Sequence, residues 1–372
     1  MIPGIYALYL PQFHETPEND KWWGQGYTDW IAVKNTKPLF RDHYQPRVPK
    51  GNNYYDLSDI SNIKNQASIA KKNGLDGFCI YHYYSNGKLM MHKPAELLHE
   101  DSSINVSYFF SWGNHDFRRN WFNGDRSILR KQEYGGKEDF ENHYSYLRSF
   151  FLDNRYLKIN NRPVFVIYQV SAIDEYDKMI SIWNNLLIQD GFDGIYIVAM
   201  QCHPGIKGSE LMKYPSVEAV MPFEPLNVRS NSSNSSIAYV YKRRIKTVIH
   251  RIRNKIVRMH QTPEIYDYKW ASKMIFKEKH DCKKFYCAFP DWDNTPRYQS
   301  KGVCFRGSTP ELFEKQMTTL LRRSIDESAE ILFINAWNEW GESAYLEPDE
   351  RFEDAYLQAV KKSVNTCFEE HV

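Results

Sequence analysis

The stretch from Ile331 to Glu342 reads ILFINAWNEWGE, a mostly apolar run that ends in an asparagine, two tryptophans and two glutamates. Such a run, closed by polar residues, is typical of a parallel β-strand buried on both faces. Seven other segments have the same character, at 4–10, 76–83, 105–112, 163–169, 194–201, 217–223 and 285–290. Together with 331–337, they give eight predicted strands.

Segments with a helical spacing of apolar residues separate most of these strands. They cover 58–73, 138–153, 174–189, 238–260, 309–325 and 351–368, whereas the connections after the second and fifth strands are shorter or irregular. Eight strands alternating with helices predict an α/β fold, a (β/α)8 TIM barrel with long βα loops, as one domain over 1–372. A doubly wound open sheet is the alternative, but no Gly-rich nucleotide loop follows any strand.

The composition argues against several classes of function. A formal net charge of +2 gives no global attraction to nucleic acid. The six cysteines are scattered without the spacing of metal ligands, and no motif calls for a cofactor. No run of 18 apolar residues predicts a membrane span. The first residues lack the basic and apolar regions of a signal peptide, so we expect a cytoplasmic location.

Two regions exceed what a barrel connection needs. Residues 11–57 form a long, aromatic first loop, which we expect to be functional. Residues 226–272 form a basic helical insertion or a barrel helix, with eight Lys and Arg between Lys242 and Arg258. The segment 242–260 is either a solvated outer helix or a basic amphipathic helix in peripheral contact with an anionic inner membrane.

Glu339 and Glu342 are predicted to meet at the mouth of the barrel, because Gly341 allows a tight turn after the last strand. Glycosidic chemistry needs one carboxyl as an acid and another as a base or nucleophile. Mutual repulsion would raise one pKa and leave the other carboxylate ionised, which divides the two roles. Alternatively, one or both glutamates form structural ion pairs with Arg297 or Arg351.

The run NEWGE followed by YLEPD resembles the signature of the WbsX-like polysaccharide-biosynthesis family of glycosyltransferases. It is also similar to the Asn-Glu-Trp-His-Glu run of glycoside hydrolase family 99, whose members are endo-α-mannosidase-like. Four more segments resemble WbsX-like proteins in the expected order: YALYLPQFHETPENDKWWGQGYTDW (6–30), DGFCIYHYYSNGK (76–88), YLKINNRPVFVIY (156–168) and FPDWDNTPR (289–297). The resemblance therefore spans nearly the whole chain.

The resemblance implies a barrel enzyme of surface polysaccharide (O-antigen or capsule) biosynthesis that makes or cleaves a glycosidic bond with retention. Carried over by motif, Glu339 is the base on the sugar's 2-hydroxyl and Glu342 the general acid/base. The implied partner is an oligosaccharide or a lipid-linked glycan, with neither metal nor cofactor. Two departures predict a changed sugar preference: Gly341 replaces the histidine of family 99, and His115-Asp116 replace a Glu-Asn pair.

Further substrate-binding candidates come from strand ends and from the matching motifs. They are His14, His82, Tyr83, Trp112, Asn114, Tyr168, Gln201, Glu224, Asp291, Asp293, Asn294, Arg297, Trp337, Asn338 and Trp340. Asp291, Asp293 and Asn294 either bind sugar hydroxyls or cap their own loop through Asx turns. Three other functions remain open: a sugar-binding barrel that has lost catalysis, a hydrolase that trims an intracellular glycan, and an unrelated metal-dependent barrel enzyme.

Overall fold

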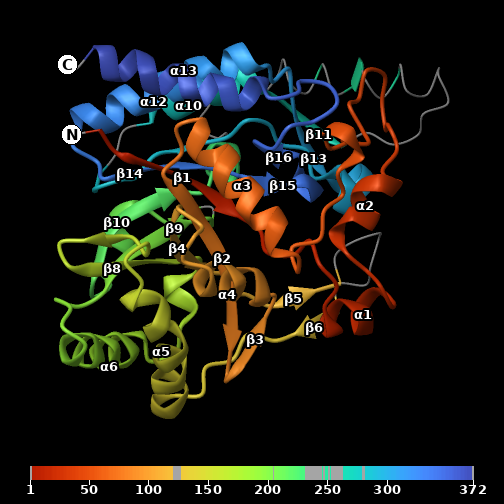
Figure 1. Cartoon of the computed structure of the whole chain (residues 1–372). Helices are drawn as coiled ribbons and strands as arrows, with labels where there is room; N and C mark the ends of the chain where they lie inside the picture. The colour runs from red at the N-terminus through yellow and green to blue at the C-terminus, as the bar shows by residue number, and fades with distance from the viewer. Residues whose placement is uncertain are drawn as a thin grey trace.

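The computed structural model describes residues 2–370, apart from 120–126, 204, 279–280 and most of 231–262, where only Ile245, Val248, Ile249 and Ile252 are described. Eight parallel strands form the centre of the molecule (Figure 1). In spatial order they are β10 (Val217–Pro222), β9 (Tyr196–Gln201), β8 (Arg162–Ile167), β4 (Ser107–Trp112), β2 (Gly77–Ser85), β1 (Gly4–Tyr9), β14 (Ile331–Ile334) and β12 (Cys287–Ala288).

The sheet curves into a nearly closed barrel. The first and last strands of the series, β10 and β12, approach each other through a parallel bridge between Val220 and Lys284. Each predicted strand is present, although β12 and β14 are shorter than expected. The predicted (β/α)8 barrel is therefore confirmed, and the open-sheet alternative is wrong.

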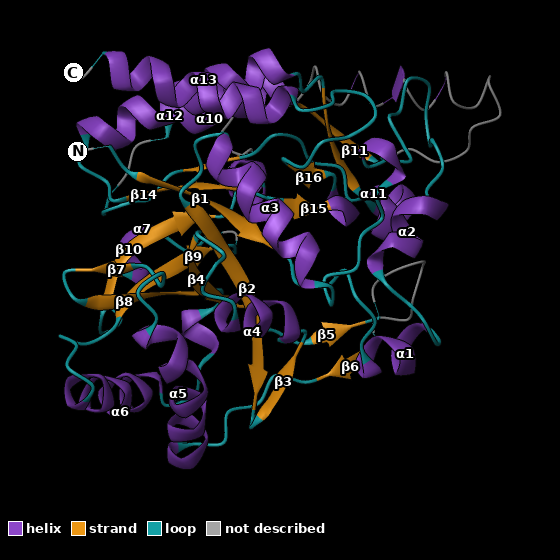
Figure 2. Ribbon diagram, in the orientation of Figure 1, coloured by secondary structure: helices purple, strands orange, loops and turns teal. Residues whose placement is uncertain are grey.

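Helices cover the outside of the barrel (Figure 2). They are α3 (Ile60–Lys72), α4 (Lys93–Glu100), α5 (Lys137–Leu152), α6 (Tyr176–Gln189), α7 (Gly208–Leu211), α8 (Leu226–Ser230), α10 (Tyr268–Lys277), α12 (Pro310–Asp326) and α13 (Ala355–Glu369). The 17-residue α12 begins at a side-chain cap: Thr309 accepts a hydrogen bond from Leu312 N, and Pro310 follows it. The predicted helix over 238–260 lies almost entirely outside the described residues.

Short elements gather where the barrel strands end. The first loop contains α1 (Pro17–Trp23) and α2 (Asp29–Asn35), and β15 (Asn338–Glu339) pairs with β16 (Ala344–Tyr345). Figure 1 shows α1, α2 and β15 on one side of the barrel. The remaining short elements are β3 (Lys88–Met90), β5 (Phe117–Arg118), β6 (Ile128–Arg130), β7 (Lys158–Ile159), β11 (Glu264–Asp267), β13 (Val303–Arg306) and α11 (Thr295–Tyr298).

The apolar runs of the sequence become one continuous core. All nine residues of β2 are buried, as expected for a strand covered on both faces. Gly77 begins this strand because a Cβ atom there would lie 1.7 Å from the carbonyl oxygen of Ser107 on β4. Among the helices that the structure describes, none is long and apolar enough to cross a membrane.

Candidate active site

A pocket of about 430 Å³ opens at the ends of the barrel strands, and both motif glutamates line it. We call it the barrel-mouth pocket. Six of the predicted site residues lie on its wall: Tyr83, Tyr168, Asn294, Arg297, Glu339 and Glu342. The structure thus brings together the two carboxyl groups that the sequence pairs, in a space open enough for a ligand.

The segment after β14 fixes where the glutamates point. Glu339 ends β15 opposite Ala344 of β16, and a single helical turn over Trp340–Glu342 follows. The side chain of the preceding Asn338 makes two hydrogen bonds with the backbone of Leu10: it accepts from the N–H at 2.7 Å and donates to the carbonyl at 2.9 Å. Asn338 therefore ties the glutamate loop to the end of β1 and does not face the barrel-mouth pocket.

Arg297 lies between the two glutamates. Its Nη2 atom is 3.0 Å from Glu339 Oε1, and its Nη1 atom is 3.2 Å from Glu342 Oε1. The ion-pair alternative is thus correct for Arg297, and Arg351 instead lies over the ring of Tyr44. Both glutamates nevertheless line the open pocket together with Arg297, so the ion pairs orient the carboxylates without removing them from the pocket wall.

A third acid, Asp29, joins this cluster from the first loop. Its Oδ2 atom accepts hydrogen bonds from Arg297 Nη2 at 2.8 Å and from Gln12 Nε2 at 2.5 Å. Asp29 was missing from the sequence prediction because it lies in the long first loop, and its approach to Arg297, 268 residues further along the chain, depends on the tertiary fold. The only signal was its position in the aromatic loop that resembles the family.

Three acids around one guanidinium cannot all be ionised at low cost. Burial raises the pKa of Glu339 to about 8, against the lowering effect of Arg297. Burial likewise raises the pKa of Glu342 and of Asp29, again opposed by Arg297. Since the glutamates interact, their protons leave as a coupled pair. The cluster can therefore hold a proton near neutral pH and release it to a reacting group.

Gly341 makes the contact between Arg297 and the glutamates possible. A Cβ atom at this position would lie 2.8 Å from Arg297 Nε and 2.9 Å from its Cζ. Any side chain at 341 would have to displace the guanidinium. Where family 99 has a histidine, this chain has Gly341, and the guanidinium of the buried Arg297 lies directly against it.

Aromatic side chains form much of the remaining wall. Tyr83 and Tyr168 were predicted, and Trp22 and Trp23 of the first loop join them. His115 also lines the pocket, and burial lowers its pKa to about 4. Wall residues that the sequence analysis did not select include Tyr81, Phe223, Trp292, Tyr298 and Asn335. Aromatic faces of this kind pack well against the C–H surfaces of sugars.

Strand pleating places two predicted residues outside the pocket. Successive side chains of a strand point to opposite faces, so Tyr81 and Tyr83 face the pocket while His82 points away. His82 Nε2 lies 2.8 Å from Nε2 of His143 on α5. Trp112 of β4 also packs against His143, with ring centroids 4.7 Å apart. Neither His82 nor Trp112 is placed to bind a ligand in the barrel-mouth pocket.

Four other predicted residues lie outside the barrel-mouth pocket, and three of them hold local structure. Asn114 bonds with the backbone of Gln169 through both its amide atoms. Gln201 donates to the carbonyl of Ile206. Glu224 accepts from Asn227 Nδ2 and Val228 N. His14 is buried but does not line the barrel-mouth pocket.

In the loop over 291–294, one residue has the capping role expected for it and another lines the barrel-mouth pocket. Asp293 Oδ1 accepts from Thr295 N, which is the Asx-type capping alternative. Asp291 pairs with Arg47 at 2.6 Å, away from the barrel-mouth pocket. Asn294 accepts from Val303 N yet lines that pocket.

One set of three potential metal ligands occurs among the described residues: His43, Asp293 and Cys304. Leu39 N donates to His43 Nδ1 at 3.0 Å, so the ring proton is on Nε2, which lies 2.7 Å from Asp293 Oδ2. A protonated Nε2 has no lone pair for a metal. The arrangement is instead a hydrogen bond between the first loop and the loop after β12.

The two predicted tryptophans of the motif also point elsewhere. Trp337 and Trp340 line a separate pocket that shares no lining residue with the barrel mouth. Trp340 stacks on Tyr345 with ring centroids 3.8 Å apart and donates from Nε1 to Glu347 at 2.7 Å. Trp337 and Trp340, predicted to bind substrate, therefore lie outside the barrel-mouth pocket.

Comparison with known proteins agrees with this fold and motif. The sequence model of the family described as Glycosyltransferase WbsX matches residues 5–360. The protein named Uncharacterized protein WxcX of Xanthomonas campestris pv. campestris (strain B100) is 28% identical over 364 residues, which are 97% of this chain and 49% of that protein. The chain thus spans about half the length of the curated relatives it matches.

Solved structures share the architecture. The GH99 endo-alpha-mannosidase from Bacteroides thetaiotaomicron, in complex with bis-tris-propane, superposes with a TM-score of 0.57 at 13% identity, over 99% of this chain and 98% of the other. A glycoside hydrolase-like protein gives 0.56 at 14% identity, over 97% and 94%. At these identities the likeness concerns the fold. The family match over nearly the whole sequence goes further: this chain belongs to the WbsX glycosyltransferase family.

Proposed function

We propose that the protein is a carbohydrate-active enzyme of surface polysaccharide biosynthesis that makes or cleaves a glycosidic bond with retention. The observation that carries the proposal is the meeting of Glu339 and Glu342 in one open pocket. Both carboxylates contact Arg297, and family membership supports a glycan as the substrate. We propose an oligosaccharide or a lipid-linked glycan in this role.

The geometry supports a division of roles between the glutamates. The side chain of Glu339 is 8% exposed and that of Glu342 is 16% exposed. The more buried Glu339 acts as the base on the 2-hydroxyl of the sugar, and its raised pKa makes it a stronger base once ionised. The more accessible Glu342 protonates the leaving oxygen and then activates the acceptor. The internal nucleophile gains a high effective concentration, so no carboxylate has to attack the anomeric carbon.

The spacing of the carboxylates supports retention. Glu339 Oε2 and Glu342 Oε1 both lie 3.2 Å from Arg297 Nη1, so these two oxygens are at most twice that distance apart. Inverting glycosidases separate their carboxyl groups by about 6.5–9.5 Å to leave room for a water molecule. The closer arrangement here is more suited to a substrate that supplies its own nucleophile.

The test is incubation of the full chain with lipid-linked oligosaccharide extracted from its host, followed by mass analysis. A gained sugar identifies transfer and a lost sugar identifies hydrolysis, and either change should disappear in Glu342→Gln. Glu311→Gln, on the exposed start of α12, is the matched control and should behave as wild type. Glycan binding without any mass change in wild type would instead support the inactive sugar-binding barrel.

We also propose that the basic segment 242–260 contacts an anionic membrane surface. Its apolar residues recur at helical spacing, and the described ones, Ile245, Val248, Ile249 and Ile252, are each about half exposed, between 49% and 56%. Basic side chains beside exposed apolar ones favour anionic lipid. Co-sedimentation with phosphatidylglycerol vesicles, but not with phosphatidylcholine vesicles, is the expected result, and equal binding to both would contradict it.

A further inference from the structure

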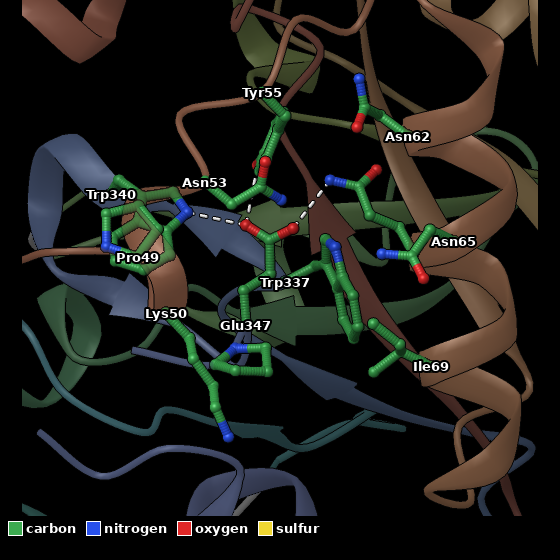
Figure 3. A pocket seen from close by; sticks show the side chains of 12 residues that line it. Pro49, Lys50, Asn53, Tyr55, Asn62, Asn65, Ile69, Trp337, Trp340 and Glu347 are labelled. Carbon is green, nitrogen blue, oxygen red and sulfur yellow. Dashed lines mark hydrogen bonds between the residues drawn. The ribbon is translucent and has the colours of Figure 1, made fainter. Parts of the chain in front are cut away.

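A second pocket, of about 210 Å³, lies between α3 and the segment that carries Glu347 (Figure 3). We call it the outer pocket. It includes Trp337 and Trp340, whereas Glu339 and Glu342 face the barrel-mouth pocket. Because Trp340 lies between the two glutamates in the chain, an occupant of the outer pocket would touch the loop that carries both of them.

The floor of the outer pocket is a buried carboxylate held by neutral donors. Glu347 is 8% exposed. It accepts hydrogen bonds of 2.7 Å from Tyr55 Oη, Gln66 Nε2 and Trp340 Nε1. A carboxylate has about four lone-pair positions. Three are occupied by the protein, so one remains for a donor that enters from the pocket.

A buried donor without a well-formed hydrogen bond lies beside this carboxylate. The Trp337 side chain is fully buried, and its Nε1–H lowers the pKa of Glu347 without making a well-formed hydrogen bond to any described residue. Its indole faces the pocket next to Glu347 (Figure 3). Buried N–H groups are rarely left unsatisfied. One hydroxyl group would satisfy both needs, since it can accept from Trp337 and donate to Glu347.

Amide side chains form the rim. Asn62 and Asn65 lie three residues apart on one face of α3, and Asn53 faces them from the first loop (Figure 3). The side chains of Asn53 and Asn65 make no hydrogen bond to other described residues and are exposed. Each amide offers two donors and one acceptor oxygen, which complements hydroxyl groups. Ile69 and Pro49 add apolar surface beside them.

The charges restrict the chemistry of the occupant. Lys50 forms an exposed ion pair with Glu353 at 2.8 Å, which partly neutralises its charge, and the Glu347 carboxylate repels an anionic ligand. A divalent cation is disfavoured as well, because a single carboxylate already holding three donors supplies too few oxygen ligands. Pockets for drug-sized ligands start near about 300 Å³, so this one fits a single ring.

We infer that the outer pocket binds a neutral polyhydroxylated ring, one sugar unit of a glycan, through Glu347, Trp337 and the asparagines of its rim. The site is separate from the barrel-mouth pocket and does not depend on catalysis there. A sugar unit bound here would be held against Trp340, within the loop of the two glutamates.

The test is ligand-observed saturation-transfer NMR on the full chain with methyl glycosides as probes. The probes are neutral hexosides, 6-deoxyhexosides and N-acetylhexosaminides, with methyl glucuronides as the anionic comparison. Asn65→Trp fills the pocket from an exposed position of α3. Ser68→Trp, exposed on the same helix but outside the pocket, is the matched control. Thermal melting confirms that both variants fold.

The expected result is binding of at least one neutral glycoside by wild type and Ser68→Trp, with at least a tenfold weaker affinity in Asn65→Trp. Trp337→Phe removes the indole N–H but keeps an aromatic ring at this position, and it should weaken binding severalfold. Absence of binding by wild type, or binding that Asn65→Trp leaves unchanged, would overturn the site. Equal binding of glucuronides would overturn the assignment to neutral sugars.

Discussion

Two buried acidic sites lie only a few residues apart in the chain, and they are built in opposite ways. Glu347 accepts from three neutral donors, and burial raises its pKa to about 7. Glu339 and Glu342 instead share a single cation, Arg297, with a third acid. Burial acts on all of them. What differs is that the donors around Glu347 fix its position, whereas the crowded acids around Arg297 keep a proton available for exchange.

The largest expected effect is a difference in enzyme activity between variants of the two sites. Glu339→Gln and Glu342→Gln should each lower kcat/KM by about 10²–10⁴-fold, the usual contribution of a general acid or base. Glu347→Gln should lower it only about tenfold, through a looser Trp340 loop. Turnover of the lipid-linked substrate measures all three. A loss in Glu347→Gln as large as in Glu342→Gln would remove the distinction.

The second prediction concerns the effect of the Arg297 charge on the pH–rate profile. Arg297 lowers the pKa of both glutamates against the effect of burial. In Arg297→Met both pKa values should rise further, so the acid limb of the pH–rate profile should move to higher pH. Gly341→Ala, whose Cβ would displace the guanidinium, should shift the profile in the same direction with a smaller loss of rate. Arg351→Met, which removes an arginine that lies against Tyr44, is the control. An unshifted profile in Arg297→Met would contradict the assigned electrostatics.

A stability measurement tests the structural role of Glu347. Glu347→Leu leaves the donors Tyr55, Gln66 and Trp340 without a partner, and each unsatisfied buried group costs about 1–3 kcal/mol. We expect the free energy of unfolding in urea to fall by about 3 kcal/mol or more. Glu138→Leu on the exposed start of α5 should change it by less than about 0.5 kcal/mol. Similar values for the two variants would show that the donors around Glu347 contribute little.

The smallest effect is a pH dependence of stability at Glu224. Burial raises its pKa to about 7, above the 4.5 expected when the chain unfolds. The folded state then binds the extra proton, so this contribution to stability is complete below pH 4.5 and is lost as the pH rises towards 7. The slope is at most about 1.4 kcal/mol per pH unit. Unfolding of Glu224→Gln between pH 5 and pH 8 should therefore vary less with pH than that of wild type, and parallel curves would contradict the shift.

The barrel could be predicted because each strand carries its own signal. Runs such as GIYALYL and DGFCIYHY are mostly apolar, as expected for strands that are buried on both faces. The position of the glutamate pair followed from its place after the last of these runs. The predicted ends of the strands were less accurate, since β12 covers only Cys287–Ala288 of the predicted 285–290. The length of a strand depends on its pairing with neighbouring strands, which the sequence of one segment does not contain.

The wall of the site could be predicted only in part. His82 and Tyr83 are adjacent in sequence and both lie near the end of β2, yet one packs against His143 and the other faces the pocket. A shift of one residue in a strand reverses the direction of every side chain. Sequence position near a strand end is therefore insufficient to choose between neighbours.

By itself, the sequence determined the order of strands and helices, the family, and the two glutamates at the end of the last barrel strand, since all of these depend on local pattern and motif. Tertiary structure alone decided that Arg297 and Asp29, 268 residues apart in the chain, meet at those glutamates, and that Trp337 and Trp340 turn towards Glu347 instead. The physical reason is that burial, charge pairing and side-chain direction depend on which distant segments pack together, which no single segment of the sequence records.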